Sequence, residues 1–93
     1  MIKVVISEVN KNRPVPSFTI IQVLWINIPE GQTFTLDNIL EAVKPYVSES
    51  AKIEKTYHNG TSIDIQMIDK DIDKLYNIRI YDIISMLGIL KYS

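Results

Sequence analysis

The segment Phe18-Thr19-Ile20-Ile21-Gln22-Val23-Leu24-Trp25-Ile26-Asn27-Ile28 carries two opposing structural signals. Its apolar residues fall at helical spacing and would form one buried stripe that includes Trp25. The same segment is rich in β-branched residues, which favour an extended strand covered on both faces. The two interpretations are nearly equal, with a slight preference for a helix. Whether this segment is a helix or a strand decides between the two architectures that the rest of the sequence permits, which are described below.

The seventeen residues before this segment divide into two parts. Residues 1–9 are predicted to form a β-strand because apolar side chains alternate along them. Residues 10–17 contain Pro14 and Pro16, which lack a backbone donor and fix φ, so a loop is predicted there. The alternating apolar residues of the strand are Ile2, Val4 and Ile6.

A helix is predicted downstream, after a turn at residues 29–32. Thr35 stands at the capping position, and apolar residues from Leu36 onward trace one face of a helix. Pro45 lacks an amide proton and disfavours helical conformation in the residue before it, so the regular helix should end near there.

The remaining residues predict a hairpin followed by helical structure. Residues 51–68 form two alternating segments around Asn59-Gly60, a dipeptide that favours the tight turn of a β-hairpin. A short helical turn is predicted at 69–75. Apolar residues from Tyr76 to Leu90 recur at helical spacing, which predicts a final helix that ends near Gly88.

Composition indicates one compact domain spanning residues 1–93, with its core in residues 18–93. The chain is 46% hydrophobic and has a net charge of −1. It contains no cysteine, which excludes disulfides, thiolate zinc sites and a cysteine nucleophile. A secretory signal and a long apolar segment are both lacking, so a cytoplasmic location is expected.

The sequence offers little for catalysis. His58 is the one histidine and stands beside the predicted hairpin turn, where exposure is expected. The aspartates of residues 69–73 resemble the start of a calcium loop, but Lys74 and Ile80 occupy the positions that require Gly and Glu. We therefore expect a non-enzymatic protein with no metal, no cofactor and no small-molecule substrate.

The C-terminal residues 75–90 resemble the second half of a helix-turn-helix, and Leu87-Gly88-Ile89-Leu90 is similar to the end of a winged-helix recognition helix. The segment Arg79-Ile80-Tyr81-Asp82-Ile83 is similar to the Arg-Arg-x-Tyr-Asp-Ile element of cell-cycle winged-helix transcription factors. Ile78 replaces the first arginine, so only Arg79 is carried over as a DNA contact. Residues 23–25, 34–36 and 39–43 resemble the first two helices of such domains.

This resemblance implies an α+β fold with about three helices and a β-hairpin, and a DNA-binding protein of transcription regulation. Its expected nucleic-acid contacts are Lys11, Arg13, Arg79 and Lys91. An apolar amphipathic helix with an incidental Tyr-Asp pair remains the alternative interpretation of the C-terminal segment.

A protein–protein interaction subunit or homodimer is the competing functional hypothesis. Here the strand at residues 1–9 would add to the sheet edge of a partner through Ile2, Val4 and Ile6. The runner-up architecture has strands on both sides of the proline loop, followed by the helix from Leu36. That layout is similar to the start of a β-grasp domain, which is usually an interaction or carrier fold.

Overall fold

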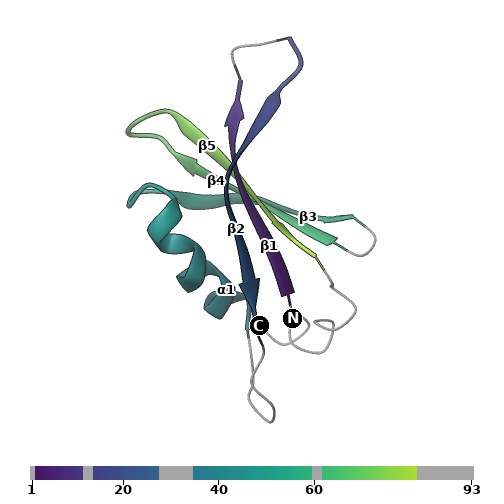
Figure 1. Cartoon of the computed structure of the whole chain (residues 1–93). Coiled ribbons are helices and arrows are strands. Elements are labelled where there is room, and N and C mark those ends of the chain that lie inside the picture. The colour runs from purple at the N-terminus through teal and green to yellow at the C-terminus, as the bar shows by residue number, and fades with distance from the viewer. Residues whose placement is uncertain (1, 12–13, 28–34, 60–61, 82–93) are drawn as a thin grey trace.

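The computed structural model describes residues 2–11, 14–27, 35–59 and 62–81 (Figure 1). These residues form one antiparallel five-stranded sheet with the strand order β2-β1-β5-β4-β3. One α-helix follows β2 in the chain. The elements are β1 (Ile2–Asn10), β2 (Ser17–Ile26), α1 (Leu36–Val43), the 3-10 turn η1 (Lys44–Tyr46), β3 (Lys52–Asn59), β4 (Ser62–Asp69) and β5 (Lys74–Ile80).

Four local predictions are confirmed. β1 forms where side chains alternate, and the described residues between β1 and Ser17, which are residues 11 and 14–16, are not part of a strand. α1 starts after Thr35, whose carbonyl accepts the first helical hydrogen bonds, and it gives way to η1 just before Pro45. β3 and β4 pair as an antiparallel hairpin within residues 51–69. The predicted Asn59-Gly60 turn lies partly outside the described residues.

The preference for a helix in residues 18–28 is wrong. This segment forms β2, which pairs with β1 along its length. A bulge interrupts the pairing, because Ile6 lies opposite Gln22 whereas Ser7 lies opposite Ile20. Ile21 is therefore the extra residue on β2. Pairing with β1 supplies the backbone hydrogen bonds that the residue pattern alone did not assign.

The C-terminal helix prediction is also wrong where the structure tests it. Residues 74–80 form β5 between β1 and β4, and residues 70–73 form the turn that connects β4 to it. The part of the predicted helix from residue 82 onward lies outside the described residues. Arg79 and its neighbours are extended, so the resemblance to a winged-helix domain does not hold.

The fold class is consequently mostly β, and an α+β fold with about three helices is wrong. The β-grasp-like alternative was right about strands on both sides of the proline loop, but it too was an α+β assignment. None of the described helices is long and apolar enough to cross a membrane.

The core lies between the sheet and α1. Ile39 and Val43 of α1 are fully buried against apolar residues of the three central strands. Burying each of these large side chains contributes about 1.5–3 kcal/mol relative to leaving it in water. The buried cluster consists of Ile2, Val4, Ile6, Ile39, Val43, Ile63, Ile65, Tyr76, Ile78 and Ile80.

Candidate functional site

The strand register divides the side chains of the sheet between two faces. Directly opposite residues of an antiparallel pair lie on the same face. Ile78 and Ile80, opposite Ile6 and Val4, belong to the core beneath α1, so the alternate residues lie on the other side. We call this side the open face, because α1 does not pack on it. Its residues are Lys3, Val5, Ser7, Val9, Phe18, Ile20, Val23, Trp25, Lys52, Lys55, Tyr57, Asp64, Gln66, Ile68, Leu75, Asn77 and Arg79.

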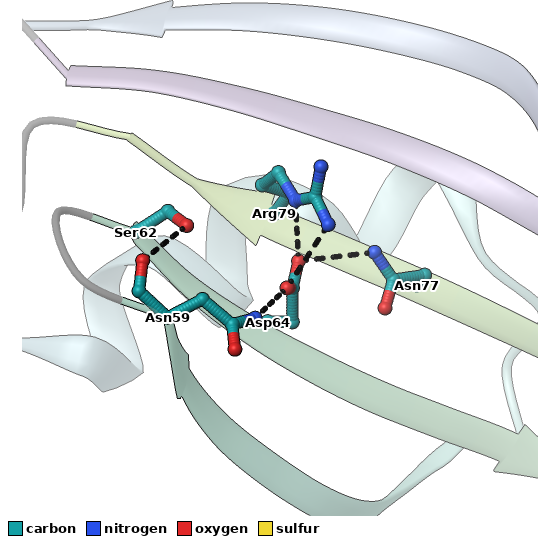
Figure 2. A network of polar contacts seen from close by, with 5 residues as sticks. All are labelled: Asn59, Ser62, Asp64, Asn77 and Arg79. Atoms are coloured by element: carbon teal, nitrogen blue, oxygen red, sulfur yellow. Dashed lines mark hydrogen bonds and ion pairs between the residues drawn. The ribbon is translucent and has the colours of Figure 1, made fainter.

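An ion pair lies on the open face between β4 and β5. Arg79 donates from Nε to Oδ1 of Asp64 at 2.7 Å and from Nη2 to Oδ2 at 3.1 Å, a bidentate arrangement (Figure 2). Asn77 Nδ2 donates to Oδ1 at 3.3 Å, and Asn59 Nδ2 donates to Oδ2. Ser62 Oγ in turn donates to the Asn59 carbonyl at 3.2 Å. The Asp64 carboxylate thus joins side chains from β3, β4 and β5.

These contacts determine the charge state of the pair. Burial acts to raise the pKa of the Asp64 carboxyl, but hydrogen bonds from Arg79 and Asn77 and the charge of Arg79 outweigh it, so this pKa lies below 3.8. The hydrogen bond to Asp64 raises the pKa of the Arg79 guanidinium. Both groups stay charged at neutral pH, so the network holds strands together and is not suited to proton transfer.

A second cluster lies where the N-terminal end of β1 meets the end of β5. The Lys3 ammonium is 5.4 Å from the ring centroids of both Trp25 and Tyr81. The Tyr81 amide also donates to the Lys3 carbonyl at 2.9 Å, which fixes the chain just beyond β5. Each contact is within cation–π range. Two aromatic rings therefore flank one cation on the open face.

β2 is an unusual edge strand. Its ten residues include no charged side chain. Phe18, Ile20 and Trp25 are 57%, 62% and 62% exposed, and Ile21 at the bulge is also exposed. The opposite edge, β3, is exposed along its whole length but carries the charged residues Lys52, Glu54 and Lys55. Charges protect sheet edges from pairing with other chains, and β2 lacks this protection.

A shallow hollow of about 300 Å³ lies on the open face between β2 and β5. Its size is at the lower end of the range for small-ligand pockets. The residues that line it are Val5, Ser7, Phe18, Ile20, Asn77, Arg79 and Tyr81. It therefore lies beside both the ion pair and the aromatic cluster.

The structure places two of the four predicted nucleic-acid contacts. Arg79 is on the open face, where its guanidinium pairs with Asp64. Lys11 is exposed just beyond β1, at the end of that strand opposite to Lys3, beside a hollow of about 410 Å³. Arg13 and Lys91 lie outside the described residues. The two described cations are not brought together into one site.

The predicted partner interface on β1 has a different role in the structure. The side chains of Ile2, Val4 and Ile6 are fully buried in the core. β1 also pairs with β2 on one side and β5 on the other, so it offers no edge to a partner. Strand addition through these residues would require the sheet to open. In the part of the chain that the structure describes, the sheet edge next to β1 is formed by β2.

The side chains that were considered for catalysis do not converge. His58 lies on exposed β3 opposite the core residue Ile63, whereas Tyr57 and Asp64 face each other on the other side of the sheet. Within the described ranges, no group of three His, Asp or Glu side chains is arranged to hold a metal ion.

Sequence reasoning missed the two features that distinguish this surface. The uncharged character of residues 17–26 was visible in the sequence, but it acquires significance only when the segment is an edge strand. The cluster of Lys3, Trp25 and Tyr81 joins residues from three separate segments, and no local pattern connects them.

No protein-family model, curated protein or solved structure matches this chain.

Proposed function

We propose that this protein is a non-catalytic interaction module that dimerises by pairing the β2 edges of two copies. The observation that carries the proposal is a ten-residue exposed edge strand without a single charged side chain. Unpaired backbone groups along such an edge are a template for another strand. The lack of enzymatic activity stays a prediction.

A second copy is the occupant that the chemistry of this edge fits best. Two identical strands related by a twofold axis run antiparallel and offer each other the same backbone groups, so the contact closes after two subunits. Like charges would meet across such a contact, and β2 has none. The apolar side chains of β2 would lie beside the same side chains of the partner, which removes part of their apolar area from water and leaves the ring faces accessible.

The bulge limits how the strands meet. It leaves two regular segments on β2, Ser17–Ile20 and Gln22–Ile26, with Ile21 between them. A dimer with its axis near Ile21 uses both segments, since each pairs with the other segment of the partner. β3 is the natural comparison, because it is also an exposed edge but is charged.

Light scattering coupled to size-exclusion chromatography tests the proposal. We expect the mass of a dimer for the wild type at micromolar concentration and the mass of a monomer for Ile20→Lys, because the two added charges would lie close together on either side of the twofold axis. The matched control is Ile53→Lys, the same change at an exposed apolar residue of β3, which should remain dimeric. A wild type that is still monomeric at about 100 μM would overturn the proposal.

Disulfide trapping locates the contact. Because the chain has no cysteine, a single introduced cysteine reports only contacts between copies. Single-cysteine variants from Thr19 to Leu24 should include one that oxidises rapidly to a covalent dimer and so marks the twofold axis. Ile53→Cys should remain reduced under the same conditions. Faster trapping at Ile53 than anywhere on β2 would contradict pairing through this strand.

A further inference from the structure

We infer that the open face binds single-stranded nucleic acid, with exposed aromatic rings stacking on bases and lysines contacting phosphates. This site shares Phe18 and Trp25 with β2, but its lysines and the rings of Tyr57 and Tyr81 lie outside that strand. Strand pairing uses the backbone edge of β2, so variants on β3 test this inference separately from dimerisation.

The first feature that fits a nucleic acid is a set of exposed aromatic rings on the open face. Phe18, Trp25 and Tyr57 share the open face by strand register, and Tyr81 joins them through its contact with Lys3. All four rings are among the exposed large side chains of the described residues. A ring whose face is accessible to solvent can stack on any base, which gives affinity without demanding a sequence.

The second feature that fits a nucleic acid is the charge of the open face. The register places Lys3, Lys52, Lys55 and Arg79 on the open face, with Asp64 as their acidic neighbour. Asp64 neutralises Arg79 through the bidentate pair, which leaves three lysines unmatched by it. The protein as a whole has a net charge of −1. The open face therefore carries a net positive charge, whereas the net charge of the whole chain is slightly negative.

The acidic groups of the other side show the same separation. Glu8 and Asp69 point to the side of the sheet that α1 covers, as their pairing with Tyr76 and Lys74 indicates. Asp37 and Glu41 are on α1 itself. On that side Lys74 lies 3.9 Å from Glu8 and Lys44 lies 3.5 Å from Glu41. A polyanion would therefore meet lysines without acidic partners on the open face and paired charges on the opposite side.

The geometry of the Lys3 cluster fits an unpaired strand rather than a duplex. Lys3 lies between Trp25 and Tyr81, so a phosphate contact and two stacking surfaces occur within one small area. Trp25 is on β2 and Tyr81 follows β5, two strand spacings or about 10 Å apart. Bases must be unpaired to stack on such rings. The neighbouring hollow lined by Phe18 and Tyr81 offers space for a base turned out of the strand.

Titration with fluorescein-labelled dT12, rU12 and a duplex of matched length tests the inference at low salt. Trp25 is the one tryptophan, so quenching of intrinsic fluorescence reports directly on the open face. We expect anisotropy to rise and tryptophan emission to fall with at least one single strand, and binding to weaken with salt with a slope of about −2 if three lysines contact phosphates.

Variants on β3 separate stacking from general charge and leave β2 untouched. Tyr57→Ala should weaken binding about 5- to 10-fold through loss of one stacked base, and Lys55→Glu should weaken it by a similar factor. Lys44→Glu makes the same charge change at an exposed residue after α1 and should bind within about twofold of the wild type.

The inference would be overturned if neither single strand bound at low salt, or if the duplex bound as tightly as a single strand. Equal weakening of binding by Lys44→Glu and Lys55→Glu would overturn it as well. Equal affinity for polyglutamate of the same charge would also overturn it, because that result would leave no part for base stacking.

Discussion

Asp64 is the residue on which the polar contacts of the open face converge. Its side chain is 7% exposed and accepts hydrogen bonds from Arg79, Asn77 and Asn59. A carboxylate in this position is stabilised only while those donors remain in place. Asp64 therefore ties β5 and the end of β3 to β4 without contributing to the apolar core.

The pH dependence of stability should reveal this role. Because the pKa of Asp64 is lower in the folded protein than its ordinary value of 3.8, the unfolded chain binds more protons between those two values, and stability rises with pH there. The contribution of Asp64 is complete above the unfolded pKa and is lost as pH falls through the folded pKa. Asp64→Asn should cost about 1–3 kcal/mol at pH 7, and less as the pH falls below 4.

Urea denaturation at pH 7, 5, 4 and 3 measures this effect. The control is Glu49→Gln, which removes an acidic charge from an exposed residue outside the network. If Asp64→Asn and the wild type lost stability in parallel from pH 5 to pH 3, the depressed pKa of Asp64 would be contradicted.

Among the elements, the turn between β4 and β5 contains a residue in the left-handed region. Asp73 is the one described non-glycine residue with positive φ, at 52°. The turn is reinforced by a hydrogen bond from the Asp71 amide to Asp69 Oδ1 at 2.9 Å. Aspartate tolerates the left-handed region better than most residues, which explains its presence at a tight turn.

Substitution of Asp73 should follow backbone preference. Asp73→Gly should change the free energy of unfolding by less than about 1 kcal/mol, and Asp73→Val should lower it by about 1–2 kcal/mol, because a β-branched residue fits this region poorly. Both are measured by urea denaturation. Equal stability of the two variants would contradict a left-handed conformation at this position.

The two edge elements differ in a way that their exposure alone does not show. β2 and β3 both border the sheet, yet only β3 carries charge along its edge. The proposed dimer and the proposed nucleic-acid site use different parts of this arrangement. The first uses the backbone of β2, and the second uses side chains of β1, β2 and β3 together with Tyr81 after β5.

Across the complete sheet, stability should increase from the edges to the centre. β1 and β5 each pair with neighbours on both sides and supply five residues of the buried cluster besides Tyr76. Amide hydrogen exchange should therefore be slowest in β1 and β5 and faster in β3. If β2 pairs between copies, its outward amides should become more protected as protein concentration rises.

This pattern is measured by exchange followed by NMR at two protein concentrations. β3 is the internal control, because its edge is not part of the proposed contact. Exchange of β1 or β5 amides at the rate of β3 would contradict the sheet order. If the exchange rates of the β2 amides did not change with protein concentration, the proposed dimer would be contradicted.

Local signals in the amino-acid sequence were sufficient for β1, the proline loop, α1 and the β3–β4 hairpin. Each depends on neighbouring residues: alternation, missing amide protons, a helix start with an apolar face, and a dipeptide suited to a tight turn. Residues 18–28 had no such signal, because their apolar residues suit a helix and a strand almost equally. In the C-terminal segment the helical spacing of the apolar residues from Tyr76 onward favoured a helix, although residues 74–80 form a strand.

Those two segments became strands because β1 lies between them. Its backbone groups pair with β2 on one side and with β5, more than sixty residues later in the chain, on the other. Pairing over such a separation leaves no trace in local residue patterns. The same register decides which side chains share a face, so the association of Lys3 with Trp25 and Tyr81, and of Asp64 with Arg79, arises only in the folded chain.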